Sequence, residues 1–182
     1  MPGTRRRADA TENRARIIEV AREVAGGSDE LRLNAVAKAA GVGQGTLYRH
    51  FPTRESLLLE VYRHEVDALC DAVPRLLARH PPLEALDRWF DQLADYARVK
   101  RGVFDAVEAA SRTEVLAHSH TRLDEAVTLL LDAGRDDGTI RDDVDARDVI
   151  LLVGYLSRLD ERERATRARH LLDIVLAGLQ AP

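Results

Sequence analysis

The most informative segment of the chain is residues 35–51, which read AVAKAAGVGQGTLYRHF. Small apolar residues form one face of its first helix, so a second helix can cross that helix at close range. Gly41 supplies the positive φ angle that a tight turn between crossing helices requires. Val42 fills the angle between the two helices, and Leu47 returns from the second helix to the same core. The spacing therefore predicts a helix-turn-helix.

The second helix of this segment, residues 44–50, is expected to direct mostly polar side chains away from the core. Its N-terminus can enter the major groove of DNA, where such side chains form hydrogen bonds with base edges or phosphates. Short helices joined by glycine turns also occur in ordinary bundles, in which exposed polar side chains are only solvated. The residues on the outward face are Gln44, Gly45, Thr46, Tyr48, Arg49 and His50.

The rest of the chain is expected to be helical as well, because no segment alternates Val, Ile or Thr with polar residues in the manner of a strand. Asn34 is the expected N-cap of the first helix of the motif, and Pro74 is expected to kink or end the helix that Thr53 begins. Further helices are predicted over residues 12–25, 83–100, 103–110, 114–133, 145–159 and 161–179. The fold class is therefore all-α.

Charge is distributed unevenly along the chain. The 182 residues include 27 Lys and Arg and 31 Asp and Glu, for a net charge of −4. Residues 1–51 carry nine basic and six acidic side chains, a net of +3, whereas residues 52–182 carry a net of −7. The acidic average therefore does not exclude DNA as a partner of the N-terminal segment.

Several other classes of protein are not supported by the sequence. No apolar run approaches the roughly 18 residues that a membrane-spanning helix needs, and the N-terminus lacks the apolar core of a signal peptide. We therefore expect a cytoplasmic protein with no membrane partner. There is no glycine-rich phosphate loop, no G-x-S-x-G and no H-E-x-x-H motif, so we expect neither an enzyme nor a cofactor.

A metal site is not expected either. Cys70 is the only cysteine, which excludes a disulfide framework and a zinc site built on several thiolates. His118 and His120 are two residues apart on a predicted helix and so point in different directions. Cys70 is expected to be a small buried apolar residue.

Residues 12–62 resemble the N-terminal part of the TetR family of bacterial repressors. The residues that match the family motif are Val36-Ala37, Ala40-Gly41-Val42, Leu47-Tyr48-Arg49-His50-Phe51, Thr53-Arg54-Glu55 and Leu57. Gly43 stands where the family usually has a Ser cap, and glycine caps a helix nearly as well. The resemblance implies an N-terminal three-helix helix-turn-helix DNA-binding domain over residues 11–52, followed by a helical ligand-binding and dimerisation domain over residues 53–182.

The resemblance also implies roles for individual residues. Gln44 and Thr46 would read or brace bases, and Gly45 would let the helix approach the groove without a clash. Tyr48 and His50 would contact the DNA backbone. Arg54, where the family usually has Lys, would hold a phosphate at the start of the next helix. The full predicted DNA-binding set is Gln44, Gly45, Thr46, Tyr48, Arg49, His50, Arg54 and Lys38.

The first ten residues are predicted to form a flexible basic arm. They are polar and include Pro2 and Gly3, residues that are common in loops. The triplet Arg5-Arg6-Arg7 suits a contact with the minor groove or with phosphates. A solubilising tail with no contact to DNA is equally compatible with these residues.

Two apolar helices near the C-terminus predict a homodimer. Residues 149–156 read VILLVGYL, which is apolar on every side of a helix and so calls for burial all round. Residues 171–179 repeat this pattern, and the C-terminal helices of TetR relatives form a two-fold interface. A core within one chain is the alternative. The predicted interface residues are Ile150, Val153, Gly154, Ser157, Leu171, Leu172, Val175 and Leu179.

A cluster of aromatic residues lies on helices that should line a ligand cavity in this family. Such a group can enclose a small apolar or aromatic effector. For any single member, packing in the core is the alternative role. The predicted pocket residues are Trp89, Phe90, Leu93, Tyr96, Phe104, Val107, Val127 and Leu130.

Together these features predict a TetR-like transcriptional regulator in the repressor role. It would bind a pseudo-palindromic operator in double-stranded DNA as a homodimer and be released by a small-molecule ligand. Two alternatives belong to other classes: a DNA-binding regulator without a small-molecule inducer, and an all-helical enzyme whose helix-turn-helix is incidental.

Overall fold

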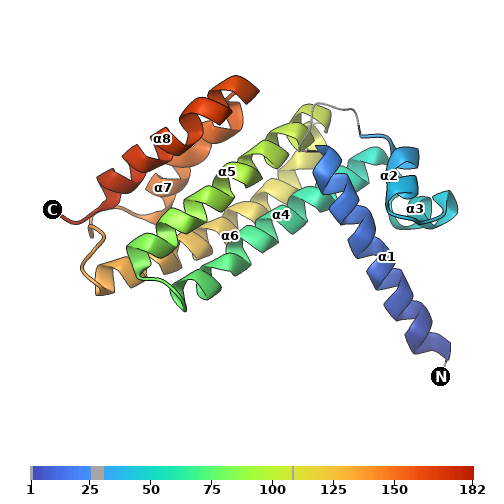
Figure 1. Cartoon of the computed structure of the whole chain (residues 1–182), viewed down its shortest axis with the longest axis horizontal. Coiled ribbons are helices and arrows are strands. Elements are labelled where there is room, and N and C mark those ends of the chain that lie inside the picture. The colour runs from blue at the N-terminus through green and yellow to red at the C-terminus, as the bar shows by residue number, and fades with distance from the viewer. Residues whose placement is uncertain (1, 26–30, 108) are drawn as a thin grey trace.

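The computed structural model describes residues 2–25, 31–107 and 109–182 (Figure 1). Side chains are described for these residues except 2–10, 25, 106, 109–115, 117–118 and 161. The helices are α1 (Pro2–Ala25), α2 (Leu33–Ala39), α3 (Gln44–His50), α4 (Arg54–Leu77), α5 (Pro82–Ala106), α6 (Ala109–Asp136), α7 (Ala146–Val153) and α8 (Glu161–Leu179), and a 3-10 turn, η1 (Gly154–Arg158), follows α7. The described residues contain no named strand, so the all-α prediction is confirmed.

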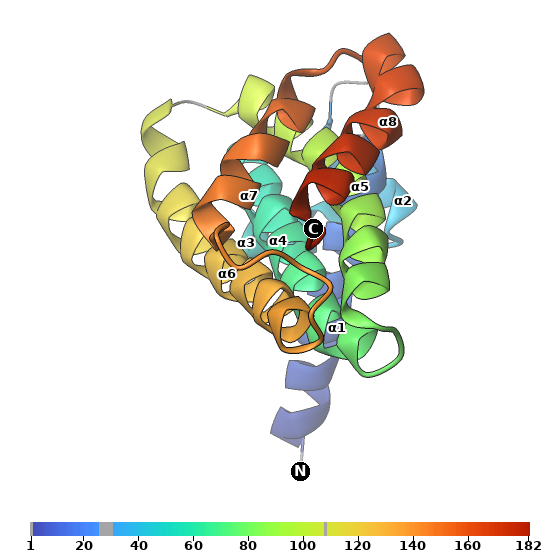
Figure 2. The same cartoon turned by 90° about the vertical axis from the view of Figure 1, so that its left-hand side faces the viewer.

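The helices divide the molecule into a small end and a long bundle (Figure 1). α2 and α3 lie at one end, beside the start of α4, and α1 projects away from the bundle. α4, α5 and α6 run side by side along the length of the molecule. From the end, α7 is seen beside α6 and α8 beside α5 (Figure 2). The helix-turn-helix therefore lies apart from the C-terminal helices.

The first ten residues differ from the prediction of a flexible arm, because α1 begins at Pro2. The segment after Gly3 is rich in Arg and Ala, which are strong helix formers, so the helix extends toward the N-terminus without a break. The side chains of Arg5-Arg6-Arg7 lie outside the described residues. Their contact with DNA stays a prediction. Gly26 and Gly27, which follow α1, also lie outside the described residues.

The turn between α2 and α3 has the geometry that the sequence predicts. Gly41 has a φ of 66°, a conformation that other residues adopt only with strain. Leu47 is fully buried, and it packs in the same core as Val36 and Ile17. Asn34 was the wrong N-cap, because α2 begins at Leu33 and its N-cap is Arg32. The start of α2 is set by burial of the helix face rather than by a side-chain cap.

α4 connects the two ends of the molecule. It begins with a capping box, in which the backbone N–H of Ser56 donates to Thr53 Oγ1 at 3.0 Å and the backbone N–H of Thr53 donates to Ser56 Oγ at 3.2 Å. The helix continues through Pro74 to Leu77. One lost backbone hydrogen bond near the end of a 24-residue helix is offset by the packing of Leu76 and Leu77 against the core.

α5 is a single helix where the sequence predicts two. It runs through Gly102 to Ala106, because Val99 and Val103 on its inner face are both buried. Burial of these two side chains outweighs the cost of about 1 kcal/mol for a glycine inside a helix. The predicted helix over residues 145–159 is also divided differently: α7 ends at Val153 and the chain continues as the 3-10 turn η1.

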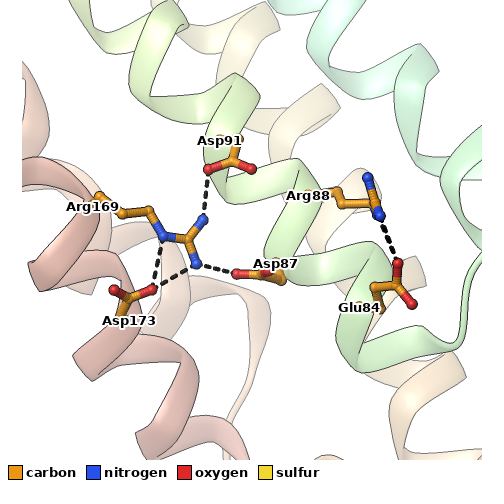
Figure 3. Close-up of polar contacts among 6 residues, drawn as sticks. All are labelled: Glu84, Asp87, Arg88, Asp91, Arg169 and Asp173. Atoms are coloured by element: carbon orange, nitrogen blue, oxygen red, sulfur yellow. Dashed lines mark hydrogen bonds and ion pairs between the residues drawn. The ribbon is translucent and has the colours of Figure 1, made fainter.

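A cluster of charges on the surface joins α8 to α5 (Figure 3). The Arg169 guanidinium of α8 binds the carboxylates of Asp87 and Asp91 on α5 and of Asp173 on its own helix. The contact with Asp91 is 2.6 Å long. A second pair on α5, Arg88 with Glu84, is local to that helix and spans one turn. Arg169 therefore helps to fix where α8 lies, whereas Arg88 does not.

Candidate DNA interface and ligand cavity

The outer face of α3 is polar and open to solvent. Tyr48 is 45% exposed although it is a large aromatic side chain, and no described aromatic ring packs against it. Gln44, Gly45 and Arg49 are exposed as well, and Lys38 is exposed on α2. Thr46, His50 and Arg54 are half-buried. The predicted DNA-binding residues therefore lie at one end of the molecule, on α3 and the adjoining ends of its neighbours.

The inner face of α3 is fixed to the rest of the molecule. Leu47 is fully buried and Phe51, which ends the helix, is 3% exposed. The Arg14 guanidinium of α1 lies over the Phe51 ring, 5.4 Å from its centroid, and pairs with Glu60 of α4 at 2.7 Å. α3 is therefore held against α1 and α2 while its polar face stays open, as a helix that enters a groove requires.

Nothing within the chain requires a glycine at position 45. A Cβ atom at this position would meet nothing within 4 Å, and the backbone does not adopt a positive φ. Gly43, the N-cap of α3, is equally unconstrained. Glycine at Gly45 lowers helix propensity without a packing benefit. The bare surface there suits the close approach of an external molecule.

An apolar cavity of about 50 Å³ lies between α5, α6, α7 and η1. Its lining comprises Trp89, Leu93, Tyr96, Ala97, Lys100, Leu123, Ile150, Val153, Gly154, Leu156 and Ser157. The α5 residues follow the spacing i, i+4, i+7, i+8 and i+11 from Trp89, which is one face of a helix. Trp89 is fixed in place because its indole N–H donates to the Leu69 carbonyl at 3.0 Å.

The cavity contains some of the predicted pocket residues and not others. Trp89, Leu93 and Tyr96 line it. Phe104 is half-buried and packs its ring against Tyr62 at 5.2 Å. The remaining four do not line the cavity because they are buried in the core around it: Phe90, Val107, Val127 and Leu130.

Lys100 is the lining residue that sequence reasoning missed and that matters most. Its position eleven residues after Trp89 places it on the aromatic face of α5, and this spacing could have identified it. The ammonium Nζ lies 5.6 Å from the centroid of the Phe104 ring and 6.0 Å from that of Tyr96. Burial lowers the pKa of Lys100 because a charged amine is poorly solvated there.

Two tyrosines connect the cavity with α4. The hydroxyl groups of Tyr62 and Tyr96 form a buried hydrogen bond of 2.9 Å. Burial raises the pKa of both tyrosines, so both are neutral at physiological pH. One turn along α4 from Tyr62, the buried carboxylate of Glu65 accepts a hydrogen bond from Arg22 of α1. One contact therefore joins the cavity to α4, and a second joins α4, three residues further along, to the helix that supports α3.

The C-terminal helices leave apolar side chains uncovered. Leu151 is 60% exposed, Leu152 51% and Ile174 55%, and they lie on α7 and α8, which are adjacent (Figure 1). We call these three residues the apolar face. Large apolar side chains that stay exposed on two adjacent helices mark these helices as a candidate interface.

The apolar face differs from the predicted interface. Val153, Leu172 and Leu179 are buried within the chain itself, so they are not available to a partner. The reason is that each helix turns one side inward and packs it against α5 and α6, which leaves only the other side for a second copy. Of the remaining predicted residues, Gly154 is exposed, and four are half-buried: Ile150, Ser157, Leu171 and Val175.

The thiol of Cys70 and the potential metal ligands were both considered in the sequence as possible sites of chemistry. Cys70 is buried, and burial raises the pKa of its thiol to about 11, so the thiolate is scarce at neutral pH. Among the residues whose side chains are described, no group of three or more His, Cys, Asp or Glu could hold a metal ion. His118 lies outside the described side chains.

Comparison with known proteins agrees with this architecture. Residues 17–61 match the model of bacterial regulatory proteins of the tetR family, and residues 81–181 match that of the C-terminal domain of SbtR-like transcriptional regulators. A solved TetR transcriptional regulator from Streptomyces coelicolor is 38% identical, with a TM-score of 0.77 over 92% of this chain and 98% of that one. The chain belongs to the TetR family.

Other relatives support the same assignment. A TetR transcription regulatory protein from Mycobacterium vanbaalenii is 30% identical, with a TM-score of 0.75 over 96% of this chain and 99% of that one. HTH-type transcriptional regulators from Staphylococcus aureus are 30% identical over 108 residues, which is 58% of this chain and 58% of each relative. The chain is thus a TetR-family transcription regulator with a DNA-binding helix-turn-helix, and not an enzyme.

No helix in the described part of the chain is both long enough and apolar enough to cross a membrane.

Proposed function

We propose that this TetR-family chain is a homodimeric repressor that binds a pseudo-palindromic operator and is released by a small molecule in the apolar cavity. The observation that carries the proposal is the open polar face of α3, where the large side chain of Tyr48 is 45% exposed. In this proposal Gln44 and Thr46 contact bases, while Tyr48, Arg49, His50, Arg54 and Lys38 contact the DNA backbone.

A second copy is placed on the apolar face. Two copies related by a two-fold axis would cover Leu151, Leu152 and Ile174 of both chains in one isologous interface. The dimer would present two α3 helices to half-sites one helical turn apart, roughly 34–36 Å on DNA. The positive N-terminal segment would face the phosphates, and the net charge of −7 on residues 52–182 would keep the rest of the dimer away from them.

Ligand release is proposed to act through the contacts between the cavity and α1. A ligand that fits one spacing of the two α3 helices better than another shifts the population toward that spacing. Movement of Tyr96 would be passed to Tyr62 and then to the neighbouring Glu65, which holds Arg22 of α1. Since α1 also packs against α2 and α3, a shift of α1 changes the position of the DNA-binding face.

The test begins with DNA. Sequences bound by the full chain would be selected from random double-stranded DNA, and we expect a two-fold symmetric site. Gln44→Ala and Tyr48→Ala should then abolish binding to that site while the helical circular dichroism signal and the unfolding temperature stay unchanged. Gln92→Ala, at an exposed glutamine of α5, is the matched control and should bind normally. Unaltered binding by the two α3 variants would overturn the DNA interface proposed here.

A further inference from the structure

Lys100 is a charged side chain within an otherwise apolar cavity. It lines the cavity together with Trp89, Tyr96 and Leu123, and its ammonium group lies over two aromatic rings. No ion pair joins Lys100 to any carboxylate among the side chains that the structure describes. The contacts that the structure gives its charged end are therefore the faces of rings, which stabilise a cation only weakly compared with an anion.

Two other partly buried cations of this chain have carboxylate partners. Arg22 pairs with Glu65, and Arg122 pairs with Asp71 at 2.8 Å. A buried charge without a counterion is unfavourable, and the lowered pKa of Lys100 reflects that cost. An anion bound beside Lys100 would supply the missing partner.

The surroundings of Lys100 are positive. Burial lowers the pKa of His120 on α6, and the nearby charges of Lys100 and of Arg147 on α7 lower it further. A lowered pKa leaves His120 neutral at physiological pH, so the positive charge of this region comes from Lys100 on α5 and Arg147 on α7. Such a field attracts an anion and repels a cation.

We propose that the cavity binds a small carboxylate with a short hydrocarbon chain, which pairs its carboxylate with the Lys100 ammonium and packs its chain against Trp89 and Leu123. The inference rests on the proposed function, in that it names the chemical class of the ligand for the same cavity. The other lining side chains are mostly apolar, which suits a hydrocarbon chain.

The size of the cavity limits the length of that chain. Its volume of about 50 Å³ is well below the roughly 150 Å³ of a protein cavity that holds benzene. A chain of a few carbon atoms fits with small adjustments, and each additional carbon must displace α7 or η1, which form one wall. Because the apolar face includes α7, displacement of this wall is a direct route from ligand to dimer geometry.

The fluorescence of Trp89 offers the measurement, because it is the only tryptophan of the chain and it lines the cavity. The full chain would be titrated with butanoate, hexanoate and octanoate, and with the amide and the primary amine of each chain length. We expect at least one carboxylate to bind with one site per chain and its amide to bind roughly tenfold more weakly. The amines should not bind, since their charge has the same sign as that of Lys100.

Lys100→Met keeps the length of the side chain and removes its charge. In this variant the preference for carboxylate over amide should disappear. Arg98→Met removes a half-buried cation of the same helix that does not line the cavity, and it should keep the preference. The comparison of carboxylate with amide on the unaltered chain needs no variant, so it tests the proposal even if Lys100→Met fails to fold.

Three results would overturn the proposal: no carboxylate of the series binds, the amide binds as well as the acid, or Lys100→Met keeps the preference. Operator binding by the ligand-free chain is measured separately. If the chain binds its selected DNA but none of the carboxylates, only the ligand class is wrong. If a carboxylate binds through Lys100 but no DNA site is selected, the ligand class holds and the repressor proposal is wrong.

Discussion

The exposed face of α3 and the apolar face of α7 and α8 differ in the chemistry that each leaves in water. α3 exposes Gln44, Tyr48 and Arg49, whose polar groups are well solvated without a partner. The apolar face exposes Leu151, Leu152 and Ile174, whose burial would stabilise a complex by about 1.5–3 kcal/mol for each fully covered side chain. One surface therefore suits a charged, hydrated partner, and the other suits a second copy of the chain.

The two surfaces are also held in place by different amounts of packing. α3 has seven residues and is fixed by one buried leucine and by its contacts with α1 and α2. α7 and α8 pack one side of each helix into the large core of the bundle. A helix that enters a DNA groove must be small and rigidly held, whereas an interface between two copies of a chain must bury a large surface area.

The apolar face can be broken by one charge. Ile174→Glu would place two carboxylates in a two-fold interface, so we expect the dimerisation constant to weaken roughly a hundredfold or more. Sedimentation velocity would show monomers, and affinity for the selected operator should fall in parallel because each monomer contacts one half-site. Ala165→Glu is the control: it lies nine residues away, on the opposite side of α8, and should stay dimeric. A dimer that persists in Ile174→Glu would show that the copies associate elsewhere.

The polar face can be altered without a change in fold. Gly45→Ala adds a methyl group that meets nothing in the chain, so the free energy of unfolding should rise by about 0.5–1 kcal/mol. Affinity for the operator should fall roughly tenfold because the methyl group occupies space that the groove needs. Thermal unfolding and a DNA titration measure the two effects on one preparation. Equal affinity of the variant and the unaltered chain would contradict a close approach at Gly45.

The proposed link between the cavity and the exposed face of α3 depends on Glu65. Glu65→Gln keeps the shape of the side chain but removes the charge that pairs with Arg22, so we expect a loss of about 2 kcal/mol in the free energy of unfolding. The release of DNA by a bound carboxylate should weaken as well. Glu60→Gln is a matched control on the same helix, where the pairs with Arg14 and Arg63 are more exposed. Equal losses in the two variants would show that burial of Glu65 does not matter.

The surface cluster of Arg169 should have the smallest effect. Arg169→Met removes all three contacts with aspartates, yet exposed ion pairs contribute about 0–1 kcal/mol and are screened by salt. Denaturant unfolding at low and high salt should reveal a small loss at low salt only. Arg88→Met, which removes a pair local to α5, is the control for the same change of charge. A loss well above 1 kcal/mol would show that the placement of α8 depends on this cluster.

Much of the local structure was predictable from the sequence. The turn at Gly41 and the bounds of α3 and α8 follow from glycine conformation, capping residues and helical periodicity, which act over a few neighbouring residues. The continuation of α5 through Gly102 was not predictable in this way. It depends on the burial of Val99 and Val103 against other helices, which no local pattern reveals.

The exposed surfaces were likewise predictable where local sequence decides them and not where packing between helices does. The motif ending in Leu47-Tyr48-Arg49-His50-Phe51 by itself determined the fold of the N-terminal segment and pointed to its outward polar residues, because inside and outside positions on a short helix follow from its period. On α7, where residues 149–156 are apolar all round, periodicity cannot say which side faces the core.

The packing of the whole chain was needed to show that Val153 is buried, that Leu151 and Leu152 are exposed, and that Lys100 lines the cavity. These outcomes depend on where the neighbouring helices lie. The spacing of residues along one helix carries no information about its neighbours.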